Sequence, residues 1–82
     1  MVRVIFDEKF QRSISKIKDS ATQNSIKNKI AKIIENPEIG KPMRYLRKGA
    51  REVYIGSFRL SYKYSKEECL IEFLEFYHKD EQ

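Results

Sequence analysis

Two residues near the middle of the chain have side chains suited to chemistry on a phosphate. Arg59 carries a guanidinium, which can contact a phosphate at two points and stabilise charge that develops there. Glu52 is the one acid between Lys41 and Tyr64. As a general base, Glu52 could take the proton of a ribose 2′-hydroxyl. The alternative interpretation is structural, because Arg59 and Glu52 could instead form an ion pair across two strands.

Three further residues are candidates for the same chemistry. His78 is the only histidine, and an imidazole that titrates near neutral pH is a suitable general acid. Arg51 could share with Arg59 the stabilisation of developing charge. Lys79 is better suited to binding a phosphate or a partner protein than to proton transfer. The alternative for His78 is a solvated residue of a polar tail.

A cationic cluster upstream of Glu52 predicts a nucleic-acid contact. Arg44, Arg47, Lys48 and Arg51 flank a predicted turn, and the net charge of the chain is +5. Lysine and arginine side chains supply most of the affinity for a phosphate backbone. Tyr54 is the candidate for stacking on a base. The alternative for the cluster is a basic loop in solvent.

The composition excludes several classes of protein. Cys69 is the only cysteine, so no internal disulfide and no site of four thiolates can form. No apolar run approaches the length of a membrane span. No phosphate-binding glycine loop or cluster of metal ligands is present. We therefore expect a cytoplasmic protein that uses no metal or cofactor, with residues 1–82 forming a single domain.

The candidate residues lie on a predicted β-hairpin. Apolar and polar residues alternate before and after Gly56-Ser57, with the two-residue period of strands. A Gly-X pair between two such runs is typical of a type II′ turn. One face of the hairpin is predicted to be apolar and to include Tyr62 and Tyr64. The other is predicted to be polar and functional, with the residues Glu52, Tyr54, Arg59, Ser61 and Lys63.

The other elements are predicted from spacing and capping signals. The stretch from Val2 to Phe6 is typical of a strand, and Asp7 can cap a helix whose Phe10 packs against Phe6. A polar break over Asp19–Gln23 precedes a second amphipathic helix, which ends before Pro37. Further strands are predicted over Met43–Leu46 and Leu70–Phe76, and a polar tail over 77–82. The predicted fold class is α+β, with the order β-α-α-β-β-β-β and both helices on one face of an antiparallel sheet.

The order of these motifs resembles the RelE/ParE superfamily of toxins from type II toxin–antitoxin systems. The hairpin REVYIGSFRLSYKY, the ending FLEFYHKDEQ and the segment NPEIGKPMRYL are similar to that superfamily in order and spacing. The subgroup that they resemble most is ParE-like. The departures lie in the strand before Gly56, where Glu52 and Tyr54 replace the usual basic residues, and at Lys79, where arginine is usual.

The resemblance implies a toxin neutralised by a cognate antitoxin that is acidic and amphipathic. The first hypothesis is an mRNA interferase, an endoribonuclease that cuts mRNA without a metal. Its partners in this hypothesis are mRNA and, as a further candidate, the ribosome. In this hypothesis Glu52 and His78 are base and acid, while Arg59 and Arg51 stabilise charge. The alternatives are a non-enzymatic ParE-like toxin that inhibits DNA gyrase, or an inactive toxin fold that only binds its antitoxin.

Overall fold

The predicted element order and the α+β class are confirmed by the computed structural model, which describes residues 1–43 and 49–81. In these residues the elements are β1 (Arg3–Phe6), α1 (Glu8–Ser15), α2 (Ser20–Glu35), β2 (Lys41–Pro42), β3 (Ala50–Ile55), β4 (Phe58–Ser65), β5 (Leu70–His78) and the 3-10 turn η2 (Lys79–Glu81). The strand predicted over Met43–Leu46 falls largely outside the described residues.

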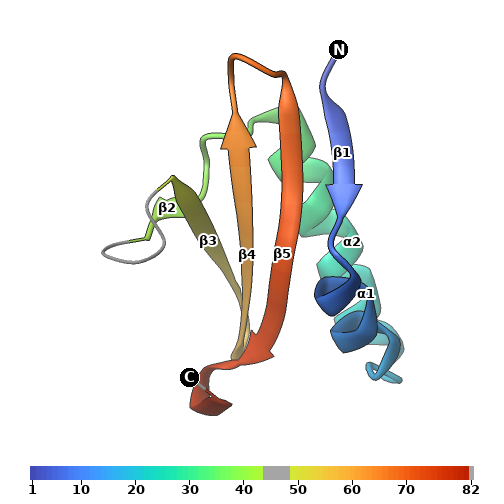
Figure 1. Cartoon of the computed structure of the whole chain (residues 1–82). Coiled ribbons are helices and arrows are strands. Elements are labelled where there is room, and N and C mark those ends of the chain that lie inside the picture. The colour runs from blue at the N-terminus through green and yellow to red at the C-terminus, as the bar shows by residue number, and fades with distance from the viewer. Residues whose placement is uncertain (44–48, 82) are drawn as a thin grey trace.

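The strands of the described residues form one mixed sheet in the order β1-β5-β4-β3-β2. The pairs β2–β3, β3–β4 and β4–β5 are antiparallel as predicted, whereas β1 joins β5 in parallel. In Figure 1 α2 passes behind β5 and β1, and α1 lies below the end of β1, so no helix covers β3, β4 and β5 on the side turned to the viewer. We call this uncovered face the front face; its residues on β3, β4 and β5 include Glu52, Tyr54, Arg59, Ser61 and Tyr77.

Both helices begin at the aspartates that cap them. Asp7 accepts a hydrogen bond from the N–H of Lys9, and Asp19 accepts one from the N–H of Thr22. The break between the helices runs from Lys16 to Asp19 and not over Asp19–Gln23, because α1 ends at Ser15, before the predicted Ile17, and α2 already begins at Ser20. Among the described residues, no helix is long and apolar enough to cross a membrane.

The core lies between the helices and the sheet. Phe6 packs against Phe10 with ring centroids 5.9 Å apart, as predicted, and stacks on Phe73 at 5.1 Å. Phe73 also contacts Phe10 and Tyr62, so this one ring joins β1, α1, β4 and β5. The fully buried side chains of the sheet include Leu60, Tyr62, Ile71 and Phe73. Burial of these apolar surfaces is the main stabilising term of the fold.

The β3–β4 hairpin forms as predicted, and β5 departs from simple alternation. Gly56 has φ +58°, as the first central residue of a type II′ turn requires. Between Ser61 and Tyr62 the register shifts, because Ser61 pairs with Glu75 while Tyr62 pairs with Phe73. Leu74 is thus an extra residue, a β-bulge on β5. The bulge allows Phe73 and Phe76, three positions apart, both to be buried.

The loop after α2 is attached to the sheet by Tyr62. The Tyr62 hydroxyl donates to the carbonyl of Pro37 at 2.8 Å and accepts from the N–H of Gly40 at 2.9 Å. Burial raises the pKa of this phenol, because its charged form would lose hydration. A Cβ at position 40 would lie 2.5 Å from the Tyr62 hydroxyl oxygen and 2.9 Å from the Cβ of Arg51. Position 40 therefore requires glycine for the close approach of backbone and side chain.

Replacing Gly40 by alanine is expected to destabilise the protein by about 1–3 kcal/mol, the usual cost of overpacking a well-filled site. Urea denaturation would measure this loss. The double variant Gly40→Ala/Tyr62→Phe is the control, because it removes the closest oxygen; its loss should be smaller than the sum of the two single losses. Strict additivity would show that the clash is not with the phenol.

Replacing Asp19 by alanine is expected to destabilise the protein at pH 7 and progressively less in acid. The Thr22 side chain and backbone, by hydrogen bonding, lower the pKa of Asp19 from its ordinary value of 3.8. A lowered folded-state pKa gives stability that is present above pH 4 and is lost as pH falls through that pKa. Denaturation of wild type and Asp19→Ala at several pH values checks this. Glu67→Ala, which removes an exposed carboxyl, is the control. Its free energy of unfolding should differ from that of wild type by the same amount at every pH.

Candidate functional site

The front face carries two adjacent rows of side chains across the three longest strands. In one row Arg59 of β4 pairs with Tyr54 of β3 and with Tyr77 of β5. In the next row Ser61 of β4 pairs with Glu52 of β3. Residues that pair directly across strands point to the same face. With Glu75 of β5, which also pairs with Ser61, the sheet gathers two carboxylates, a guanidinium and two phenols on one surface.

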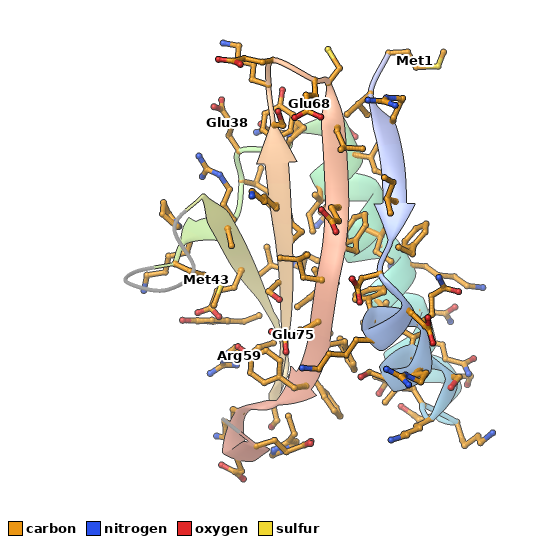
Figure 2. The ribbon with its side chains drawn as sticks, in the orientation of Figure 1. Met1, Glu38, Met43, Arg59, Glu68 and Glu75 are labelled. Atoms are coloured by element: carbon orange, nitrogen blue, oxygen red, sulfur yellow. The ribbon has the colours of Figure 1, made fainter. Side chains whose placement is uncertain are left out.

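Arg59 stacks on the ring of Tyr54. Its guanidinium carbon lies 3.9 Å from the ring centroid, a cation–π geometry, and Nη1 donates to the carbonyl of Phe58 at 3.3 Å. Figure 2 shows Arg59 on the front face near the lower end of the sheet. Within the described part of the chain, no ion pair joins Arg59 to Glu52. The ion pair with Glu52, which was the structural alternative for Arg59, is therefore not formed, and the contact of the Arg59 guanidinium is with the ring of Tyr54.

Glu52 is held by a residue that sequence reasoning missed. The Tyr77 hydroxyl donates to Oε2 of Glu52 at 3.4 Å, a long hydrogen bond between β5 and β3. The prediction placed Tyr77 in a polar tail, but it continues β5. Tyr77 pairs with Arg59 and therefore lies on the same face. Because of the bulge at Leu74, counting every second residue along β5 from Ile71 would place Tyr77 on the opposite face.

Ser61 does not contribute an exposed group, contrary to the prediction. Its side chain is fully buried, and its Oγ has no hydrogen-bond partner among the described residues. Ser61 pairs with both Glu52 and Glu75, and Glu75 forms an ion pair with Lys9 at 2.8 Å. Alternation gives the face of a strand correctly here, but it does not give exposure.

His78 lies on the face opposite Arg59 and Glu52. It follows Tyr77 on β5, so its side chain points toward the helices, where its ring meets that of Phe58 edge-on at 5.3 Å. Its Nδ1 accepts from the N–H of Asp80 at 3.2 Å. The predicted acid His78 and the predicted base Glu52 are therefore separated by the sheet. The reason is that β5 extends through His78, whereas a loose tail was expected.

Arg51 also lies on the helix side of the sheet. It shares the parity of Val53, and its Nη1 donates to the carbonyls of Glu38 at 3.0 Å and Gly40 at 2.8 Å. The guanidinium thereby fastens the loop after α2. Arg51 is not brought to the face where the prediction required it for charge stabilisation.

The remaining predicted binding residues are placed as follows. Arg44, Arg47 and Lys48 lie outside the described residues. Tyr54 is half-exposed on the front face. Lys79 is exposed on η2, where its backbone N–H donates to the carbonyl of Ser57 at 2.8 Å.

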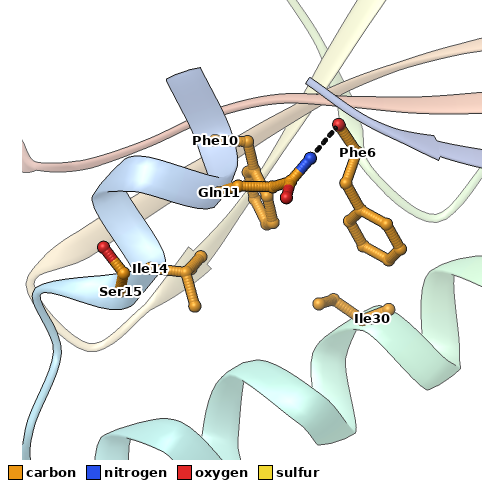
Figure 3. Close-up of a pocket in the computed structure, with 6 residues that line it drawn as sticks. All are labelled: Phe6, Phe10, Gln11, Ile14, Ser15 and Ile30. Carbon is orange, nitrogen blue, oxygen red and sulfur yellow. Dashed lines mark hydrogen bonds between the residues drawn. The ribbon is translucent and has the colours of Figure 1, made fainter. Parts of the chain in front are cut away.

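A second surface feature lies between the two helices. An apolar hollow of about 460 Å³ opens beside the end of β1, as Figure 3 shows. The side chain of Gln11 donates to the carbonyl of Phe6 at 2.8 Å at its rim. A neighbouring hollow of about 470 Å³ shares Ile14 and Ile30 and is flanked by Lys18 and Lys27. The hollow in Figure 3 is lined by Phe6, Phe10, Gln11, Ile14, Ser15 and Ile30.

The front face combines side chains whose chemistry suits phosphate binding and proton transfer. Arg59 supplies positive charge, Glu52 supplies a proton acceptor, and Tyr77 supplies a donor that bonds to that acceptor. Among the described residues, no group of histidine, cysteine and acidic side chains is arranged to hold a metal ion. The arrangement therefore contains the components of hydroxyl activation next to a phosphate.

The sequence matches a family model described as the ParE toxin of the type II toxin–antitoxin system parDE, over residues 4–82. No curated protein matches the sequence at a significant level. The match covers nearly the whole chain, including all the strands that form the front face.

Solved structures similar to this chain come from the same class of systems. A chain of the E. coli RelBE toxin–antitoxin complex has a TM-score of 0.79 at 18% identity, covering 95% of this chain and 96% of that chain. A chain of the RelBE2 complex of Mycobacterium tuberculosis has a TM-score of 0.79 at 22% identity, covering 94% of this chain and 96% of that chain. The YoeB/ParE toxin of Agrobacterium tumefaciens has a TM-score of 0.82 at 13% identity, covering 94% of this chain and 98% of that chain. At these identities the likeness is one of fold.

Proposed function

This chain belongs to the ParE toxin family of type II toxin–antitoxin systems, and on that premise we propose that it arrests growth by cleaving RNA on its front face. The observation that carries the proposal is the gathering of Arg59, Glu52 and Tyr77 on that face, with Tyr54 exposed beside them. A base next to a guanidinium suits a reaction that needs only the ribose hydroxyl as nucleophile.

In the proposed reaction, the Glu52 carboxylate takes the proton of a ribose 2′-hydroxyl. The 2′-oxygen then attacks the adjacent phosphorus, and the 5′-oxygen leaves and is protonated by solvent. The products are a 2′,3′-cyclic phosphate and a 5′-hydroxyl. Arg59 stabilises the charge on the phosphoryl oxygens in the transition state, and a neighbouring base stacks on Tyr54.

A second candidate is inhibition of DNA gyrase without catalysis, the alternative that the resemblance to ParE-like toxins implies. The observation in its favour is the family match itself, together with the position of His78 and Arg51 on the other face of the sheet. In this candidate, Arg59 and Tyr54 would serve as contacts to a protein target.

Inducible expression of the full chain distinguishes the two. RNA cleavage predicts an early loss of protein synthesis and new 5′-hydroxyl ends in mRNA. Gyrase inhibition predicts an SOS response while mRNA stays intact. Normal growth in both assays would leave the third possibility, an inactive toxin fold that only binds its antitoxin.

We further propose that the apolar hollows between α1 and α2 receive an amphipathic, acidic segment of the cognate antitoxin. The E. coli and M. tuberculosis relatives were crystallised as toxin–antitoxin complexes. The apolar floor formed by Ile14 and Ile30, flanked by Lys18 and Lys27, suits a helix with one apolar stripe and acidic edges. Co-expression with the product of the adjacent gene should restore growth, and Ile30→Glu should abolish that rescue while leaving toxicity.

A further inference from the structure

The hydrogen bond between Tyr77 and Glu52 crosses the strand that lies between them. Tyr77 belongs to β5 and Glu52 to β3, while β4 is hydrogen-bonded to both strands. The bond therefore spans β4 on the front face. Ser61 of β4, which pairs with Glu52, is fully buried on the same face. The burial of Ser61 is consistent with the Tyr77 and Glu52 side chains meeting above it on the front face.

Arg59 does not compete for the Glu52 carboxylate. In register Arg59 lies directly opposite Tyr77, but its guanidinium is directed to the ring of Tyr54 on the other side. Among the side chains that the structure describes, the one hydrogen-bonded to Glu52 is Tyr77. A glutamate has three rotatable bonds, so a neutral donor at a fixed place is needed to select one carboxylate orientation.

We propose that Tyr77 is a positioning residue for RNA cleavage, which holds the Glu52 carboxylate in the orientation needed to accept the ribose proton. The inference rests on the proposed function. The hydrogen bond engages Oε2, so Oε1 is the oxygen that accepts the proton from the ribose. At 3.4 Å the bond is long, and such bonds shorten when substrate fills a site. Tyr77 itself acts only through Glu52 and forms no bond with the reacting atoms.

The test uses Tyr77→Phe in the full chain, with a short RNA as substrate. Because the variant removes a hydrogen bond to a charged group, we expect kcat to fall about 10- to 100-fold with KM unchanged. Tyr64→Phe is the matched control, since it removes a phenol from the helix side of β4. Its kcat should equal that of wild type. Thermal melting of both variants checks that the fold is kept.

A double-mutant cycle separates positioning from general structural support. Glu52→Gln alone should lower kcat by about 10²–10⁴-fold, as expected for loss of a general base. If Tyr77 acts through Glu52, adding Tyr77→Phe to Glu52→Gln should cause no further loss. A further 10-fold loss in that background would overturn the inference, because the phenol would then act independently of the carboxylate.

The failure of this inference differs from failure of the proposed function. Full activity of Tyr77→Phe with an inactive Glu52→Gln would overturn the role of Tyr77 and leave RNA cleavage standing. Should wild type leave RNA intact while growth stops, the proposed function falls and the inference falls with it. Should Tyr77→Phe unfold, Glu52→Asp provides the second test. It keeps the charge but shortens the side chain, which takes the carboxylate out of reach of the Tyr77 hydroxyl. With Tyr77 in place, its kcat should therefore fall about 10- to 100-fold, and an unchanged kcat would overturn the inference.

Discussion

Replacing Arg59 by alanine is expected to lower RNA cleavage by about 10²–10³-fold, the usual effect of removing one group that stabilises transition-state charge. Arg59 is the cation stacked on Tyr54 in the row next to Glu52. Single-turnover cleavage of a labelled RNA by the purified variant measures the loss. The same variant should lose most of its toxicity when expressed without antitoxin.

Lys63→Ala is the control for this result. Lys63 is an exposed cation on the same strand and face, but it lies four residue pairs away from Arg59, opposite Ala50 and Glu72. If cleavage depended only on the positive field of the front face, both variants would lose activity to the same extent. Undiminished growth arrest by Arg59→Ala would contradict a catalytic role of this residue.

Replacing Phe73 by alanine is expected to destabilise the protein by about 3–5 kcal/mol, the cost of deleting a buried aromatic ring. Phe73 is fully buried and contacts the rings of Phe6, Phe10 and Tyr62. A small domain has a total stability of about 5–15 kcal/mol, so this loss is a large part of it. Urea denaturation measures the difference.

The neighbour of Phe73 gives the matched control. Leu74 is the extra residue of the bulge and is half-buried. Leu74→Ala should therefore cost clearly less than Phe73→Ala, although both changes truncate an apolar side chain on β5. Equal losses would mean that the aromatic cluster is not the centre of the core.

The sequence was sufficient to predict the hairpin, because its signals are local. Gly56-Ser57 between alternating runs predicts a type II′ turn, and the structure has φ +58° at Gly56. Phe6 and Phe10 are likewise joined by a short stretch of chain. Asp19 was assigned to a break between helices, since a capping aspartate and a loop aspartate look alike before the helix is seen.

The candidate site could be predicted only in part, because β5 departs from a two-residue period. The bulge adds Leu74, after which alternation counted from Ile71 assigns each residue to the wrong face. Tyr77 and His78 were moreover assigned to a polar tail and not to β5, so Tyr77 was missed and His78 was treated as a partner of Glu52. Arg51 is different: its parity with Val53 already indicated the helix side, and the prediction gave more weight to its charge than to that signal.

The parallel pairing of β1 with β5 has a consequence for synthesis of the toxin. Arg3 pairs with Leu70 and Phe6 with Phe73, so the first strand can complete the sheet only after the last one has been translated. Such a topology has a high contact order, and the nascent chain lacks both Phe73 and Tyr77 until then. The front face is therefore assembled late, after most of the chain has left the ribosome. A ribosome that is still translating this chain therefore carries a polypeptide whose front face is incomplete.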